Sequence, residues 1–182
     1  MQSEKANARD AAAVTVAAGA GQEEQIQATG VYTVECIGAD GQVKWTEQIK
    51  NLVVTVGKND LLDKYFTGTS YTATWYLGLI NSGGTFSAGD TMVTHGGWTE
   101  NTGYAAATRP APTWNAASSG SKATTATAFS INASGTIGGA FMTTDNTKGG
   151  TAGILYSAGN FTGGNRTVAS GDTLNVTYTA SV

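Results

Sequence analysis

Charged side chains are scarce in this sequence of 182 residues. Asp, Glu, Lys and Arg together make up 13% of it, against roughly 25% in an average soluble protein. The net charge is −3 and no block of Lys or Arg occurs, so nothing predicts electrostatic binding to nucleic acid. Thr, Ser, Asn, Gln and Gly must therefore cover most of the surface.

Cysteine and histidine each occur once, as Cys36 and His95. A lone cysteine excludes an intrachain disulfide. Cys36 lies in the alternating stretch VYTVECI, which favours a buried, inert thiol over a catalytic one. His95 lies beside two glycines in VTHGGW, and we expect it in a loop rather than in the role of a base. Without a pair of His or Cys residues, the sequence predicts no zinc-type metal site.

Long apolar runs are also missing. No run of 18 apolar residues is present, so the sequence predicts no membrane-spanning helix. A signal peptide needs a basic start and a strongly apolar middle. The start here, MQSEKANARD, is neutral, and the following AAAVTVAAGA contains no Leu, Ile or Phe. We therefore expect neither a secretion signal nor a membrane partner.

Catalytic motifs are absent as well. No Ser stands in a G-x-S-x-G turn, and neither an EF-hand loop nor a phosphate-binding loop occurs. The carboxylates are few, and their spacing does not support an acid pair facing across a cleft. We therefore expect no enzymatic activity, no metal and no cofactor.

The first 30 residues differ in composition from the rest of the chain. Ala, Gln, Glu and Gly dominate them, with Val14, Val16 and Ile26 as the larger apolar side chains. Such a segment buries too little area to offset the entropy lost on ordering it, and a short Ala-rich helix within it would need a partner. We predict an arm over residues 1–30 and a single β-sandwich domain over residues 31–182.

Beyond this arm, apolar and polar side chains alternate as they do in β-strands. VYTVECI (31–37) and VKWTEQI (43–49) flank an Asp-Gly pair, which predicts a hairpin. NLVVTV (51–56) predicts a third strand, and KNDLLDKYF (58–66) predicts one helix capped by Asn59. Further strands are predicted over 72–80, 126–133, 135–144, 153–159 and 173–182. Many short strands with Gly, Ser and Asn turns predict an all-β fold, a β-sandwich or jelly roll.

Aromatic side chains gather in the middle third of the chain. Trp98, Tyr104 and Trp114 are candidates for an exposed contact surface, because rings on a β-sandwich can stack on sugars. The alternative is that Trp98 and Trp114 close the ends of the sandwich or an oligomer interface. The sequence leaves both interpretations open.

Several motifs follow one another along the chain: VECIGADGQVKWTEQIKNLVVTVGKNDLLDKYFTG, WYLGLI, GDTMVTHGGWTE, RPAPTWN, ATAFSINASGTIGGAFMTT and VASGDTLNVTYT. In this order, over about residues 32–180, they resemble a family of small structural proteins of tailed bacteriophages, of the head decoration or cement kind. The resemblance implies a virion protein on the capsid surface, made in the host cytoplasm, that binds the major capsid protein and copies of itself as a trimer or dimer. A tail, neck or head-fibre protein and a carbohydrate-binding module are the alternatives.

The resemblance also gives the arm a role. If extended at about 3.3 Å per residue, the segment before Gly30 spans on the order of 95 Å, which is enough to reach a neighbouring subunit. The interface residues that this predicts, contact points and joints together, are Val14, Val16, Ile26, Gly19, Gly21 and Gly30. When such an arm becomes ordered on binding, the entropy that it loses lowers its net affinity. Many symmetric copies on one shell offset this loss through avidity.

Overall fold

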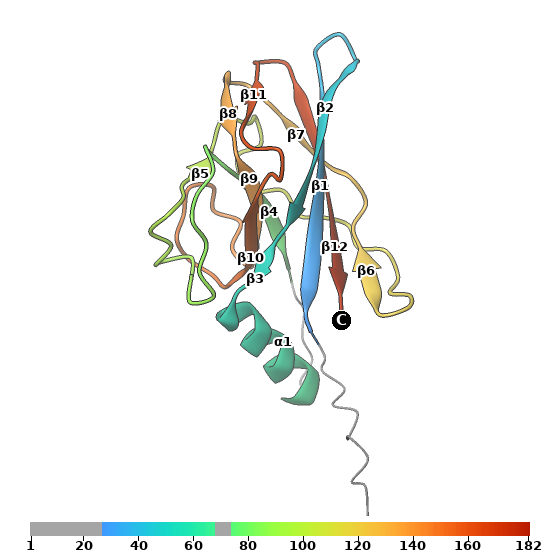
Figure 1. The fold of residues 1–182 in the computed structure, drawn as a ribbon, viewed down its shortest axis with the longest axis vertical. Helices are drawn as coiled ribbons and strands as arrows, with labels where there is room; N and C mark the ends of the chain where they lie inside the picture. The colour runs from blue at the N-terminus through green and yellow to red at the C-terminus, as the bar shows by residue number, and fades with distance from the viewer. Residues whose placement is uncertain (1–26, 68–73) are drawn as a thin grey trace, which may run out of the picture.

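The computed structural model describes residues 27–67 and 74–182. Within these ranges the chain folds into a sandwich-like, all-β structure with one helix (Figure 1). The strands form two larger antiparallel sheets and a separate two-stranded pair. The predicted all-β fold is therefore confirmed.

The first sheet is built around the two ends of the described chain. Its strands are β1 (Thr29–Ile37), β2 (Val43–Lys50), β6 (Ser121–Ala123), β7 (Thr127–Ser130) and β12 (Thr173–Ser181). They lie in the order β2-β1-β12-β6, and β7 also pairs with β12. β1 and β12 pair along their full lengths, from Thr29 opposite Ser181 to Ile37 opposite Thr173. The first and last strands thus form the centre of this sheet.

The second sheet packs on the inner face of the first. Its order is β3-β10-β9-β4-β5. Its strands are β3 (Leu52–Val53), β4 (Tyr76–Ile80), β5 (Glu100–Asn101), β9 (Gly139–Thr143) and β10 (Leu155–Asn160). The separate pair consists of β8 (Gly135–Ile137) and β11 (Arg166–Val168). Every residue of β9 is buried, as expected of a strand with neighbours on both sides and a covered face.

The predicted hairpin is confirmed. β1 and β2 pair antiparallel, and the turn between them places Gly41 at a φ of 75°, which glycine adopts without a steric cost. On the inner face, Tyr32, Val34 and Cys36 are fully buried in the main core. The prediction of a buried Cys36 is therefore also confirmed.

The predicted boundary between a third strand and the helix is wrong. Strand pairing ends at Val53, and α1 (Thr55–Thr67) begins within the stretch predicted as strand. The Val54 N–H still donates to the Tyr156 carbonyl of β10 at 3.1 Å, and the helix begins at the next residue. Gly57 in the first helical turn then packs against the backbone of Tyr156. Tertiary packing here overrides the strand preference of the β-branched residues that precede it.

The prediction that Gly30 is a joint of the arm is wrong. It lies inside β1, paired with Ala180, and its φ is not positive. A Cβ at this position would lie 2.0 Å from the Tyr178 hydroxyl, so glycine is needed here to make room for that ring. The other predicted interface residues lie outside the described residues: Val14, Val16, Gly19, Gly21 and Ile26.

Candidate functional site

A buried ion pair joins β5 and the loop after it to the loop that follows β9. Arg109 is 1% exposed, and its Nε and Nη2 donate to the two carboxylate oxygens of Glu100 at 3.0 and 2.8 Å. Nη1 donates to the Asp145 carbonyl at 2.9 Å and Nη2 to the Gly150 carbonyl at 2.7 Å. Glu100 also accepts from the Gly149 N–H at 2.7 Å. Because the guanidinium is surrounded by these acceptors, the cluster clamps the loops together.

Two of the three predicted contact aromatics are interior residues, so the prediction of an exposed surface is wrong for Trp98 and Tyr104. Trp98 is 5% exposed and stacks on His95, with ring centroids 3.9 Å apart. Tyr104 is fully buried and packs edge-on against Phe129 at 5.0 Å. Burial also raises the pKa of the Tyr104 hydroxyl, which keeps it neutral. Both rings stabilise the loops and the core, as the alternative interpretation held for Trp98.

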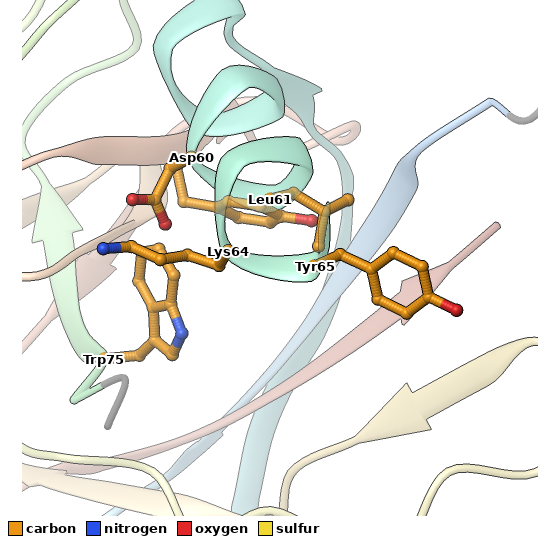
Figure 2. A pocket seen from close by; sticks show the side chains of 6 residues that line it. Asp60, Leu61, Lys64, Tyr65 and Trp75 are labelled. Atoms are coloured by element: carbon orange, nitrogen blue, oxygen red, sulfur yellow. The ribbon is translucent and has the colours of Figure 1, made fainter. Parts of the chain in front are cut away.

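Trp114 instead lines a cavity at the end of the sandwich where α1 lies. This cavity, which we call the mouth groove, has a volume of about 410 Å³. Its lining residues are Leu61, Trp75, Trp114, Lys122, Met142, Tyr156 and Ala180. A second cavity of about 280 Å³ continues along α1 and shares Leu61, Trp75 and Tyr156 with the first. Figure 2 shows the side chains of this second cavity, with Trp75 facing the helix.

The floor of the mouth groove is a chain of packed rings. Trp75 meets Tyr156 edge-on at 5.2 Å, and Tyr156 meets Tyr178 at 6.4 Å. Trp114 also packs edge-on against Tyr178, with ring centroids 6.2 Å apart. Burial raises the pKa of Tyr156 and of Tyr178, so both hydroxyls stay protonated at neutral pH. The groove is therefore aromatic and uncharged at its base, which favours an apolar occupant.

The helix beside the groove exposes apolar side chains. We call this apolar group the α1 tip. Its side chains are Leu61 (42% exposed), Leu62 (53%), Tyr65 (79%) and Phe66 (76%). Their helical spacing follows the sequence prediction, yet they do not face the core. In the described ranges, the other large exposed hydrophobic side chains are scattered singly. A contiguous apolar patch of this kind marks an interaction surface.

The packing of α1 explains this exposure. Among the helix residues whose burial is described, Gly57 and Asp60 are buried, and the helix contacts β10. A Cβ on Gly57 would lie 2.6 Å from the Tyr156 carbonyl oxygen, so the first half of the helix is held close to that strand. The second half lies below the sheets, at the same end as the start of β1 and the C-terminus (Figure 1).

The sequence does not single out Trp75 and Tyr156 as groove residues. Trp75 lies in the apolar run TATWYLGLI, which predicts a core strand, and Tyr156 lies in GILYSAG. Trp75 comes just before β4 and Tyr156 is the second residue of β10, so both rings lie at strand ends rather than in the middle of the sandwich. Only the pairing of β4 and β10 with β9 brings the two together.

Cys36, near the end of β1, belongs to a second polar cluster centred on Asp172. Its Sγ lies 3.7 Å from an Asp172 carboxylate oxygen, which also accepts from Lys44 at 2.7 Å and from the Ala169 N–H at 2.9 Å. Burial and the adjacent carboxylate raise the pKa of the Cys36 thiol to about 11. A thiol held protonated in this way is a poor nucleophile.

Within residues 27–67 and 74–182, neither a metal-binding cluster nor a membrane-spanning helix is present. No group of three or more His, Cys, Asp or Glu side chains lies close enough there to hold a metal ion. No helix in the same ranges is long and apolar enough to cross a membrane.

The fold and site together define a sandwich-like, all-β protein with an aromatic groove and an apolar helix tip at one end. Comparison by sequence adds no relative to this description. No protein-family model matches the chain, and no curated protein matches it. The function must therefore be argued from the groove, the tip and the composition.

Proposed function

We propose that this protein is a virion structural protein, a capsid decoration subunit that binds the major capsid shell and copies of itself. The observation that carries the proposal is the apolar α1 tip, in which Tyr65 and Phe66 are each more than three-quarters exposed. Exposed rings next to a groove suit a contact with another protein, because aromatic side chains contribute most to the energy of such interfaces.

The position of the predicted arm supports the same role. Thr29 begins β1 opposite Ser181, and the neighbouring Ala180 lines the mouth groove. The chain before Thr29 therefore joins the domain at the end that carries the α1 tip. Two attachment elements at one end suit a subunit that is placed many times on a shell, where repeated weak contacts add up through avidity.

The described polar clusters support a structural rather than a catalytic role. Arg109 and Glu100 are committed to loop backbone and to each other, and Asp172 is committed to Lys44 and Ala169. Side chains held in this way connect segments of the fold. A shell-binding subunit needs such rigidity and no reacting group.

Binding to undecorated capsids tests the proposal. The double variant Tyr65→Ser and Phe66→Ser removes the rings of the tip, and deletion of residues 2–28 removes the arm ahead of β1. We expect each to lower occupancy on capsids in a sedimentation assay. Val93→Ser is the matched control, since Val93 is a 74% exposed apolar side chain away from the tip. Unchanged occupancy of both test proteins would refute the decoration role.

Copy number distinguishes the decoration role from the tail, neck or head-fibre alternative. A decoration subunit coats the shell and is present in hundreds of copies, whereas a neck protein is present in a handful. Gel densitometry of purified virions measures this ratio against the major capsid protein. A low copy number would move the protein away from the head surface.

Carbohydrate binding is the second candidate, and the mouth groove is the observation that favours it. Trp75, Trp114 and Tyr156 offer rings on which a sugar can stack. The walls provide few polar partners for sugar hydroxyls, and Lys122 already donates to the Asn115 carbonyl at 2.9 Å. A glycan array with Trp114→Ala as control tests this function. Trp98→Ala is unsuitable as a control, because Trp98 is part of the core.

A further inference from the structure

The mouth groove and the α1 tip form one continuous apolar surface. Leu61 lines both cavities and belongs to the tip, and Tyr65 lines the second cavity. Two aromatic side chains of the size of Tyr65 and Phe66 each offer about 150–250 Å² for burial, and most of that area is exposed here. Covering this surface would be strongly favourable, at roughly 25 cal/mol per Å² of apolar area.

The register of β1 directs the preceding chain toward this surface. Gly30 and Tyr32 point to the inner face of the first sheet, and Gly30 pairs with Ala180, which lines the groove. Side chains alternate along an extended chain, so Ala28 and Ile26 share the inner side if the strand direction continues. Ala28 is partly buried, whereas Gln27 is exposed, as this alternation requires.

The composition of the preceding chain complements the surface. Residues 11–18 read AAAVTVAA, with no charge and only small apolar side chains or Thr, which suit a narrow groove. Glu23 and Glu24 come just before Ile26, and Lys122 stands at the wall of the groove. The charge of this acidic pair is complementary to that of the basic side chain at the groove.

We propose that the mouth groove and the α1 tip bind residues 11–26 of the same chain, with Ile26 as the anchor nearest β1. The ten residues from Ile26 back to Val16 extend over about 33 Å at most, which allows the Val-containing stretch to fold back onto α1. A tethered segment acts at an effective concentration in the millimolar range. The chain's own arm is therefore favoured over the same segment of another copy.

A fluorescence experiment on the full-length protein tests this docking without any capsid. Cys36 is fully buried and its thiol has a raised pKa, so an added cysteine is labelled selectively. Ala18→Cys carries a bimane label, whose fluorescence tryptophan quenches on contact. We expect quenching at position 18 by Trp75 and Trp114. The same label on Ser3→Cys, outside the proposed docking segment, is the matched control and should stay bright.

Two changes separate docking from other causes of quenching. Leu61→Glu places a charge on the shared wall and should restore the fluorescence of the Ala18→Cys label, while Val93→Glu should not. Leu61 is 42% and Val93 74% exposed, so both variants are expected to fold. A bright label at position 18, or equal quenching at positions 3 and 18, would overturn the proposal.

Dilution tests whether the occupant belongs to the same chain. Quenching by the protein's own arm is unchanged when the labelled protein is diluted from micromolar to nanomolar concentration. Loss of quenching on dilution would assign the groove to the arm of a second copy and would refute docking within one chain. A docked arm and a capsid shell would compete for the α1 tip, so the two proposals are separate claims. Capsid binding and quenching are measured separately, and either proposal can fail without the other.

Discussion

At the residue scale, the buried charges serve the backbone of loops. The Glu47 carboxylate pairs with Arg166 and accepts a hydrogen bond from the Gly163 N–H. The Glu100 carboxylate does the same with Arg109 and the Gly149 N–H. In each case a carboxylate satisfies both a guanidinium and a loop amide. With few charges in the sequence, those that are buried fix long connections between short strands.

Replacing Arg109 should therefore destabilise the whole fold. Arg109→Ala leaves Glu100 buried without its partner, and breaking a buried pair in this way costs about 3–5 kcal/mol. Urea unfolding followed by tryptophan fluorescence measures the loss. Lys50→Ala, at an exposed position of β2, is the control and should lie close to wild type. Near-equal stability of the two variants would contradict the clamp role.

Asp172 should make stability depend on acid pH. Burial alone raises the pKa of its carboxyl, but the Ala169 N–H and the Lys44 ammonium outweigh burial and hold that pKa below its ordinary value. A carboxyl whose pKa is lower in the folded state stabilises the fold fully at pH values above its unfolded-state pKa of about 3.9. This stabilisation is lost as the pH falls through the folded-state pKa.

Asp172→Asn isolates this contribution. At pH 7 we expect the variant to be less stable by about 1–3 kcal/mol, because a buried ionic hydrogen-bond network is weakened. The difference from wild type should shrink as pH falls below about 4, because the Asp172 carboxyl of the unfolded wild type takes up a proton first and that of the folded protein only at its lower pKa. Urea unfolding from pH 7 to pH 2 measures both curves. A difference that stays constant with pH would contradict the assignment.

At the scale of elements, Gly57 determines how α1 meets the second sheet. Gly→Ala inside a helix is ordinarily stabilising by about 1 kcal/mol. Here a Cβ would lie 2.6 and 2.8 Å from backbone atoms of Tyr156, which cannot move without disturbing β10. We expect Gly57→Ala to destabilise the protein by about 1–3 kcal/mol in thermal unfolding. Asn59→Ala, on the exposed side, should be neutral or slightly stabilising.

The elements also show how far the sequence predicts this fold. Long alternating runs such as 31–37 and 173–182 predict β1 and β12 closely, because one buried face forces a period of two. The run 135–144 is predicted as one strand but forms β8 and β9, since Gly138 between them packs against the backbone of Gly83. That close approach is a tertiary contact, which local pattern does not contain.

The candidate site is less predictable than the fold for the same reason. Spacing along 58–66 correctly predicts a helix with an apolar side, but burial is the default expectation for such a side. Its exposure depends on Gly57 holding only the first half of α1 against β10. Trp98 and Trp114 look alike in sequence, and their different surroundings come from loops with little regular structure.

At the scale of the whole molecule, the chain closes on itself. β12 pairs with β1, β6 and β7, so the last strand connects segments from both ends and the middle of the sequence. Tyr178, Val176 and Leu174 on this strand are fully buried in the main core. Contacts between such distant parts of a sequence slow folding, because loop-closure entropy is lost before they form.

The two ends should therefore respond in opposite ways to truncation. Deletion of residues 173–182 removes β12, which leaves β1 without its longest partner and opens the main core. We expect this protein to lose near-UV circular dichroism and cooperative urea unfolding. Deletion of residues 2–28 removes a longer stretch but spares every described strand, since β1 begins at Thr29.

The N-terminal deletion should keep a single cooperative transition, because the paired strands and both core clusters lie within residues 29–182. The comparison is sharp because the shorter deletion is expected to be the damaging one. If both truncated proteins unfolded cooperatively, closure by β12 would not be needed for folding. If neither did, the segment before Thr29 would contribute to the core itself, and its role would extend beyond covering the mouth groove.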